Sequence, residues 1–109
     1  MDEQALAHPE KLRSTILDAR PACIFNLFEG FSNNAQREAD FADILDSLRV
    51  PYTGNNARTL RLCLNKETAK NILRQHQVPV PDGICLRNGD AVEGCSLQFP
   101  LFINLNLTP

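Results

Sequence analysis

The feature that most constrains the fold is an almost unbroken apolar run at residues 22–27, enclosed between Pro21 and Gly30. A short apolar run between turn-forming residues predicts a β-strand that is buried on both faces. Residues 38–48 then carry apolar side chains at i, i+3, i+4 and i+7, which predicts an amphipathic helix. An extended segment at 50–53 follows. Strand, helix and strand within about 30 residues predict a βαβ unit with parallel strands and a right-handed crossover.

The rest of the chain supplies helices around this unit. Residues 3–20 predict one helix if Pro9 lies in its first turn, and Pro21 ends it. Further helices are expected at 57–64 and 66–76, with Asn65 as the N-cap of the second. Short strands are expected at 84–87 and 100–105, joined by a turn-rich connection. The predicted fold class is α/β, a short parallel sheet with flanking helices.

Composition excludes several classes of protein. The chain has 109 residues, 43% of them hydrophobic and 22% charged, which indicates one ordinary globular domain at most. A net charge of −2 argues against a dedicated nucleic-acid binder. No run reaches the roughly 18 to 20 apolar residues of a membrane span. The acidic N-terminus is unlike a secretory signal, so we expect a cytoplasmic protein. The four cysteines lack zinc-site spacing, and we expect buried free thiols.

Three polar clusters are candidates for chemistry. The first is Asn26 to Gly30, where Glu29 and Gly30 follow the first predicted strand, and the second is Tyr52 to Asn56, where Tyr52, Thr53 and Gly54 close the second strand. Ligands of parallel sheets bind beyond the carboxyl ends of the strands, where both clusters are expected. Each also has a structural interpretation, as a solvated loop or as a turn with a helix cap.

The third cluster is a basic stripe on the helix at 66–76. Lys66 begins this helix and precedes Lys70 and Arg74 on one face. Such a stripe is commonly a solvated face. The alternative is that Lys66 binds a phosphate, because backbone N–H groups at a helix start add to its charge. No Walker-type or G-x-G-x-x-G motif accompanies it.

Taken in order, the clusters resemble the D-alanine:D-alanine ligase-like branch of the ATP-grasp family. The matching fragments are IFNLFEG at 24–30, REA at 37–39, VPYTG at 50–54, LNK at 64–66 with Lys70, VPVP at 78–81 and FPLFI at 99–103. The family's corresponding fragments include "FN-x-x-EG", "IPYTGS", "x-DK-x-x-x-K" and "G-[IV]-P-x-P". The resemblance covers residues 20–103, and six fragments in order are more specific than any one alone.

This resemblance implies an ATP- and Mg²⁺-dependent carboxylate:amine ligase that proceeds through an acylphosphate. It places Glu29 and Gly30 at the first amino-acid substrate, Tyr52, Thr53 and Gly54 in a neighbouring pocket loop, and Lys66 at the nucleotide phosphates. It assigns residues 1–77 to a partial, Rossmann-like pre-ATP-grasp domain with its helical connection. Residues 78–109 are then a linker and the first strands of a truncated ATP-grasp domain. The implied partners are an amino acid and ATP, with no nucleic acid and no membrane.

The sequence also departs from the family pattern. Asn65 stands where the family prefers Asp, and Asn104-Leu105 stands where it has Lys-Pro. The catalytic arginine, the Mg²⁺ ligands and the adenine pocket belong to later parts of the family sequence. We therefore expect a fragment that is inactive alone. Two alternatives stay open: a degenerate α/β binding module that pairs with itself or a partner chain through a sheet edge, and an ATP-grasp ligase of another amino-acid or peptide substrate.

Overall fold

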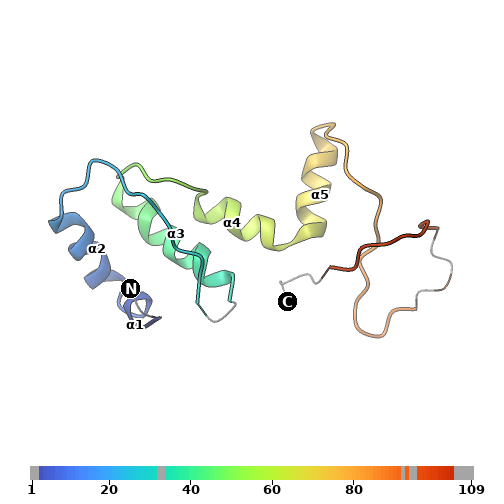
Figure 1. Ribbon diagram of the computed structural model, residues 1–109, viewed down its shortest axis with the longest axis horizontal. Coiled ribbons are helices and arrows are strands. Elements are labelled where there is room, and N and C mark those ends of the chain that lie inside the picture. The colour runs from blue at the N-terminus through green and yellow to red at the C-terminus, as the bar shows by residue number, and fades with distance from the viewer. Residues whose placement is uncertain (1–2, 32–33, 92, 94–95, 105–109) are drawn as a thin grey trace. The chain divides into compact units, whose positions relative to one another are not determined.

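The computed structural model describes residues 3–31, 34–91, 93 and 96–104. The described helices are α1 Glu3–Leu6, α2 Pro9–Asp18, α3 Gln36–Leu48, α4 Ala57–Leu64 and α5 Lys66–Gln75 (Figure 1). The chain divides into two units, Met1–Leu64 and Asn65–Pro109. The first unit contains α1 to α4, and the second begins with α5.

The single helix expected over residues 3–20 is two helices. Pro9 is the first residue of α2, and a turn at Ala7 and His8 separates it from α1. Proline has no backbone N–H and its ring clashes with the preceding turn, so it starts a helix but does not continue one. Half-buried Leu12 and Ile16 of α2 pack against the core cluster on α3.

Helix α3 forms the core of the first unit, as its apolar spacing predicts. Its buried cluster consists of Phe41, Ile44, Leu45 and Leu48. Leu45 is completely buried, and the side chains of Ala39 and Ala42 are also inaccessible. Full burial of a leucine side chain such as Leu45 stabilises the fold by about 1.5 to 3 kcal/mol.

Helix α4 is held against α3 by ion pairs as well as by buried Ala57. The Arg61 guanidinium lies 3.2 Å from a carboxylate oxygen of Asp40 and also pairs with Asp43. Hydrogen bonding to Arg61 lowers the pKa of Asp43, and hydrogen bonding to Asp43 raises the pKa of Arg61. All three side chains are substantially exposed to solvent, so this network contributes little stability per pair.

The predicted parallel sheet is reduced to one bridge among the described residues. Ile24 and Tyr52 form an isolated parallel bridge, on either side of α3 in sequence. The parallel sense agrees with the predicted βαβ unit, but neither segment extends into a strand. An isolated antiparallel bridge joins Phe31 and Asn34. The described part of the chain is therefore helix-rich, and the α/β class is only loosely compatible with it.

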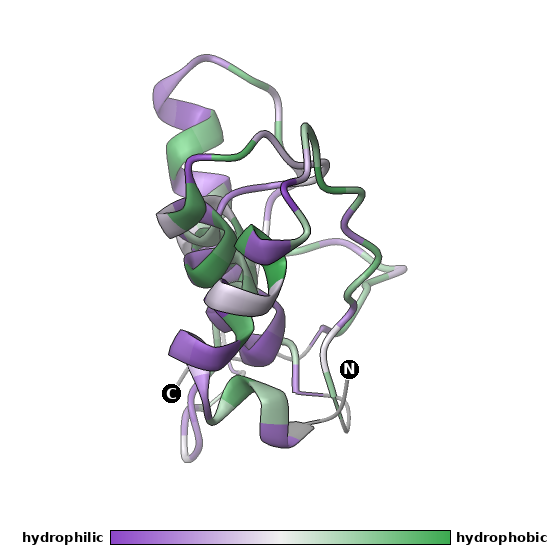
Figure 2. Cartoon of the chain, turned by 90° about the vertical axis from the view of Figure 1, so that its left-hand side faces the viewer, coloured by the Kyte–Doolittle hydropathy of each residue, from purple (hydrophilic) through white to green (hydrophobic). Residues whose placement is uncertain are grey.

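Residues 22–27 are not buried on both faces as predicted. Ile24, Asn26 and Phe28 are half-buried, whereas Phe25 and Leu27 are 73% and 75% exposed. The extended segment runs alongside α3, and this helix covers only one of its faces (Figure 1). Alternate residues of an extended chain point to opposite sides, so a single covering layer leaves every second side chain in water. Figure 2 accordingly shows hydrophobic stretches on extended backbone as well as on helices.

The second unit contains α5 and extended chain. Asn65 caps α5 as predicted, with its side-chain oxygen accepting a 3.0 Å hydrogen bond from the Thr68 N–H. The strands expected at 84–87 and 100–105 are wrong for the described residues, which have no strand pairing there, while Leu105 lies outside them. Their apolar side chains are exposed, Phe102 by 97%. Strands need a partner to satisfy their backbone groups, and the described residues offer none.

Two further observations complete the fold. Cys23, Cys63 and Cys85 are free, but they are exposed and not buried as expected, and Cys95 lies outside the described residues. No helix within the described ranges is both long enough and apolar enough to span a bilayer.

Candidate functional site

Two of the predicted clusters meet at the bridge between Ile24 and Tyr52. The Ile24 N–H donates to the Pro51 carbonyl at 2.8 Å, and the Thr53 N–H donates to the Ile24 carbonyl at 3.0 Å. One step further on, the Asn26 N–H donates to the Thr53 hydroxyl oxygen at 2.9 Å. Here a side-chain hydroxyl takes the place of a backbone carbonyl as the hydrogen-bond acceptor, and the backbone pairing between the two segments ends. The segments that lead into Glu29 and Gly30 and into Gly54 are therefore joined directly.

The first segment turns immediately after Asn26. The Asn26 side-chain oxygen accepts a 3.0 Å hydrogen bond from the Phe28 N–H, which is a local Asx-type turn. The Phe28 ring then packs on Phe31 and Phe41, with centroid separations of 5.1 and 4.9 Å. This packing anchors the segment on α3 and leaves the Glu29 side chain exposed. A carboxylate in this position is free to meet a cationic group from solution.

Gly30 has a structural reason to be glycine. Its φ is +90°, and a Cβ added there would lie 2.9 Å from the Asn34 carbonyl oxygen. An L side chain is strained at this φ, and backbone does not yield to relieve the contact. Gly30 therefore lets the chain turn away from the bridge. The geometry gives this role whether or not a ligand binds beside Glu29.

The second segment is held between the bridge and α3. The Tyr52 hydroxyl donates a 2.6 Å hydrogen bond to Asp46 on α3. Gly54 has a φ of +100°, and a Cβ built there would lie 3.9 Å from the Asn26 side-chain nitrogen. Burial, followed by the hydrogen bond to Asp46, raises the pKa of Tyr52 to about 12. At neutral pH its hydroxyl is therefore a hydrogen-bond donor and not a base.

Asp46 is the residue that sequence reasoning missed. It lies among acidic residues of an exposed helix face, and no motif distinguishes it. The contact with Tyr52 depends on how the chain turns after α3, where Arg49 adopts a left-handed φ of 56°. Spacing along the helix alone does not identify such a contact.

Lys66 belongs to the second unit and is exposed at the first residue of α5. The cap by Asn65 satisfies the Thr68 N–H, one of the four free N–H groups at the helix start. Within the same unit, Lys70 approaches Gly83, where an added Cβ would lie 3.0 Å from the lysine Nζ. The role of Lys66 at a nucleotide remains a prediction.

The described residues do not fit a magnesium site. They contain no group of three or more His, Cys, Asp or Glu side chains placed to hold a metal ion. The exposed acids Asp40 and Asp43 of α3 pair with Arg61 and are thus engaged by a cation already.

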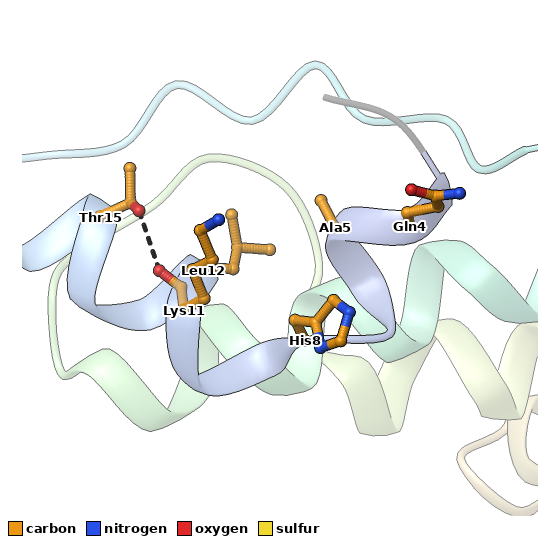
Figure 3. A pocket seen from close by; sticks show the side chains of 6 residues that line it. All are labelled: Gln4, Ala5, His8, Lys11, Leu12 and Thr15. Carbon is orange, nitrogen blue, oxygen red and sulfur yellow. Dashed lines mark hydrogen bonds between the residues drawn. The ribbon is translucent and has the colours of Figure 1, made fainter.

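One hollow among the described residues lies away from the predicted clusters. It has a volume of about 290 Å³ and is lined by α1, α2 and the turn between them, with Gln4, His8, Lys11 and Thr15 at its polar edge (Figure 3). Thr15 donates its hydroxyl to the Lys11 carbonyl at 2.8 Å and is thereby partly satisfied. None of the site residues predicted from the sequence lines this hollow.

Comparison with known proteins finds partial similarity to D-alanine–D-alanine ligases. The chain is 31% identical over 72 residues to that of Coxiella burnetii, a match that covers 66% of this chain and 18% of the relative. It is 26% identical over 92 residues to that of Methylorubrum populi, covering 84% of this chain and 29% of the relative. It is 27% identical over the same length to that of Methylobacterium radiotolerans.

The chain thus spans between 18% and 29% of the length of these curated relatives. No model of a known protein family and no solved structure matches it. The similarity supports a distant relationship to ligases of this kind.

Proposed function

We propose that this chain supplies the amino-acid-binding segments of an ATP-dependent carboxylate:amine ligase resembling D-alanine–D-alanine ligase. The observation that carries the proposal is the hydrogen-bonded junction of the two predicted clusters. The Asn26 N–H contacts the Thr53 hydroxyl at 2.9 Å, so the turn with Glu29 and the loop with Tyr52, Thr53 and Gly54 share one anchor. The distant similarity to D-alanine–D-alanine ligases supports the choice of substrate.

The proposed contacts follow from the chemistry of an amino acid, which carries an ammonium and a carboxylate. The exposed Glu29 carboxylate suits the ammonium, because charge-assisted hydrogen bonds are stronger than neutral ones. The Thr53 hydroxyl accepts from Asn26, so its own proton is available to an acceptor such as the substrate carboxylate.

Phosphate contact is assigned to Lys66 at the start of α5, where the helix dipole adds to its charge. ATP would supply the phosphoryl group that activates a carboxylate. The described residues offer no Mg²⁺ ligand set, so we expect binding without turnover by this chain alone. In this proposal residues 1–77 belong to the substrate domain and 78–109 lead into the nucleotide domain.

The test of amino-acid binding is an NMR titration of the 109-residue chain with D-alanine. We expect chemical-shift changes at the amides of Glu29, Gly30 and Tyr52–Gly54. Glu29→Gln removes the charge and should abolish them, whereas Glu93→Gln, the same change at an exposed glutamate of the second unit, should not. Shifts confined to other residues, or equal binding by both variants, would refute the assignment. L-Alanine and dipeptides in the same titration test a ligase of other substrate.

Turnover is tested by ATP hydrolysis with and without D-alanine. We expect no D-alanine-dependent hydrolysis. Hydrolysis that requires D-alanine and disappears in Lys66→Ala would contradict the expectation that the chain is inactive, and would at the same time establish the role of Lys66.

A second candidate function is a non-catalytic module that pairs with another chain along residues 24–28. The observation that favours it is the exposed apolar side of this segment, formed by Phe25 and Leu27. Among the described residues the segment pairs only with Tyr52, and an open backbone edge is a template for pairing with another strand. Size-exclusion chromatography with light scattering measures the molar mass and so tests whether the chain pairs with a second copy of itself. A monomer at all accessible concentrations would argue against it, as would no effect of Phe25→Ser.

A further inference from the structure

The Asp46 carboxylate accepts hydrogen bonds from two elements outside its own helix. One carboxylate oxygen accepts the Tyr52 hydroxyl at 2.6 Å, and the other accepts the Ala57 backbone N–H at 3.2 Å. Tyr52 lies in the loop that ends at Gly54, and Ala57 is the first residue of α4. A single side chain therefore joins the last turn of α3, this loop and the start of the next helix.

Asp46 accepts a hydrogen bond from one of the N–H groups at the start of α4. The first N–H groups of a helix have no partner within it. The Asn56 side chain accepts from the Thr59 N–H at 2.9 Å, and Asp46 accepts from the Ala57 N–H. The first turn of α4 contains no acidic residue of its own. The negative charge that stabilises a helix start is thus provided here from α3.

The same charge is unfavourable for α3 itself. Asp46 lies in the last turn of α3, which contains no basic residue, and the helix dipole disfavours an anion there. Aspartate is also a weak helix former. Its favourable contacts are consequently those with Tyr52 and Ala57. Asp46 therefore stabilises the loop and the start of α4, and it destabilises the end of α3.

Both sides of the loop are therefore fastened. On one side Thr53 bonds to Ile24 and Asn26, and on the other Tyr52 bonds to Asp46. These attachments fall on Tyr52 and Thr53, which are two of the three loop residues assigned to the substrate. We infer that Asp46 is a positioning residue, which holds the Tyr52–Gly54 loop against Asn26 so that the amino-acid site is formed before ligand arrives. This inference rests on the proposed function for its substrate.

The experiment compares Asp46→Ala with Asp43→Ala in the full chain. Asp43 is an exposed aspartate one turn earlier on α3 whose partner is Arg61, so it is a matched control. We expect Asp46→Ala to shift the amide signals of Ala57, Thr53 and Asn26 and to weaken D-alanine binding at least fivefold. Asp43→Ala should leave the Thr53 and Asn26 signals in place. Asp46→Glu retains the carboxylate and should restore part of the affinity.

The outcomes separate the inference from the proposed function. If Asp46→Ala moves only Ala57 while Asn26, Thr53 and the affinity stay unchanged, the positioning role is wrong. If the unmodified chain binds no D-alanine but Asn26 and Thr53 still shift in Asp46→Ala, the proposed substrate fails and the positioning of the loop stands. Asp46→Asn has nearly the same volume without the charge and repeats the comparison if Asp46→Ala does not fold, as judged by circular dichroism.

Discussion

The pKa of Tyr52 can be measured directly, and it reports the burial of the phenol and its hydrogen bond to Asp46. It is the only tyrosine and the chain has no tryptophan, so the near-ultraviolet absorbance of tyrosinate reports this one residue. Burial, then the hydrogen bond to Asp46 and the charges of Asp46 and Asp43, together raise its pKa from 10.0 to about 12. We expect the absorbance midpoint well above that of a free tyrosine.

The shift also fixes the direction of a stability change. Two pKa units correspond to about 2.7 kcal/mol of preference for the neutral phenol. Tyr52 is only half-buried, and solvent screening reduces the realised value to about 1 to 2 kcal/mol. Because the folded pKa is the higher one, this stabilisation is fully present below about pH 10. The stabilisation is lost as the pH rises from about 10 toward 12. In this range the unfolded state has released the tyrosine proton while the folded state still holds it.

Asp46→Asn tests the cause of the shift. Removing the charge should lower the Tyr52 pKa part of the way toward 10, because burial remains. Asp43→Asn should lower it less, since its charge is the smallest contribution. Circular dichroism on the same samples ensures that the fold is retained. A midpoint near 10 in the unmodified chain, or an unchanged midpoint in Asp46→Asn, would refute the reasoning.

Two further predictions concern stability. Leu45→Ala should lower the free energy of unfolding by about 2 to 5 kcal/mol, because Leu45 is fully buried, whereas Leu17→Ala, at a side chain 48% exposed, should cost far less. Urea unfolding followed by circular dichroism measures both, and equal costs would contradict the assigned core. Arg49→Gly should stabilise the chain by about 0.5 to 1 kcal/mol, since Arg49 ends α3 with a φ of 56°. Arg58→Gly, within α4, should instead destabilise by about 1 kcal/mol in the same assay.

Local signals in the sequence predict the helices well. The apolar spacing on α3 identifies Phe41, Ile44, Leu45 and Leu48, and all four are buried. Asn65 is predicted as a cap and is one. These features depend on neighbours within about one helical turn, and a one-dimensional pattern contains that information.

The extended segments are predicted less well. The run at 22–27 suggests burial on both sides, yet Phe25 and Leu27 are exposed, and among the described residues the expected sheet is one parallel bridge between Ile24 and Tyr52. A strand takes its stability from partners that are distant in sequence. Apolar composition indicates that a segment prefers to be covered, and it does not say which element covers it.

For the candidate site, the sequence alone determined which residue types are present and in what order: a carboxylate and glycine at 29–30, a Tyr-Thr-Gly loop at 52–54 and a lysine at a helix start. Only the tertiary structure decided that the segments carrying the first two are joined through Asn26 and Thr53, and that Asp46 binds the Tyr52 hydroxyl. The physical reason is that hydrogen bonds join atoms by position in space. The partners here are 27 and 6 residues apart, and the turns at Gly30 and Arg49 set those positions.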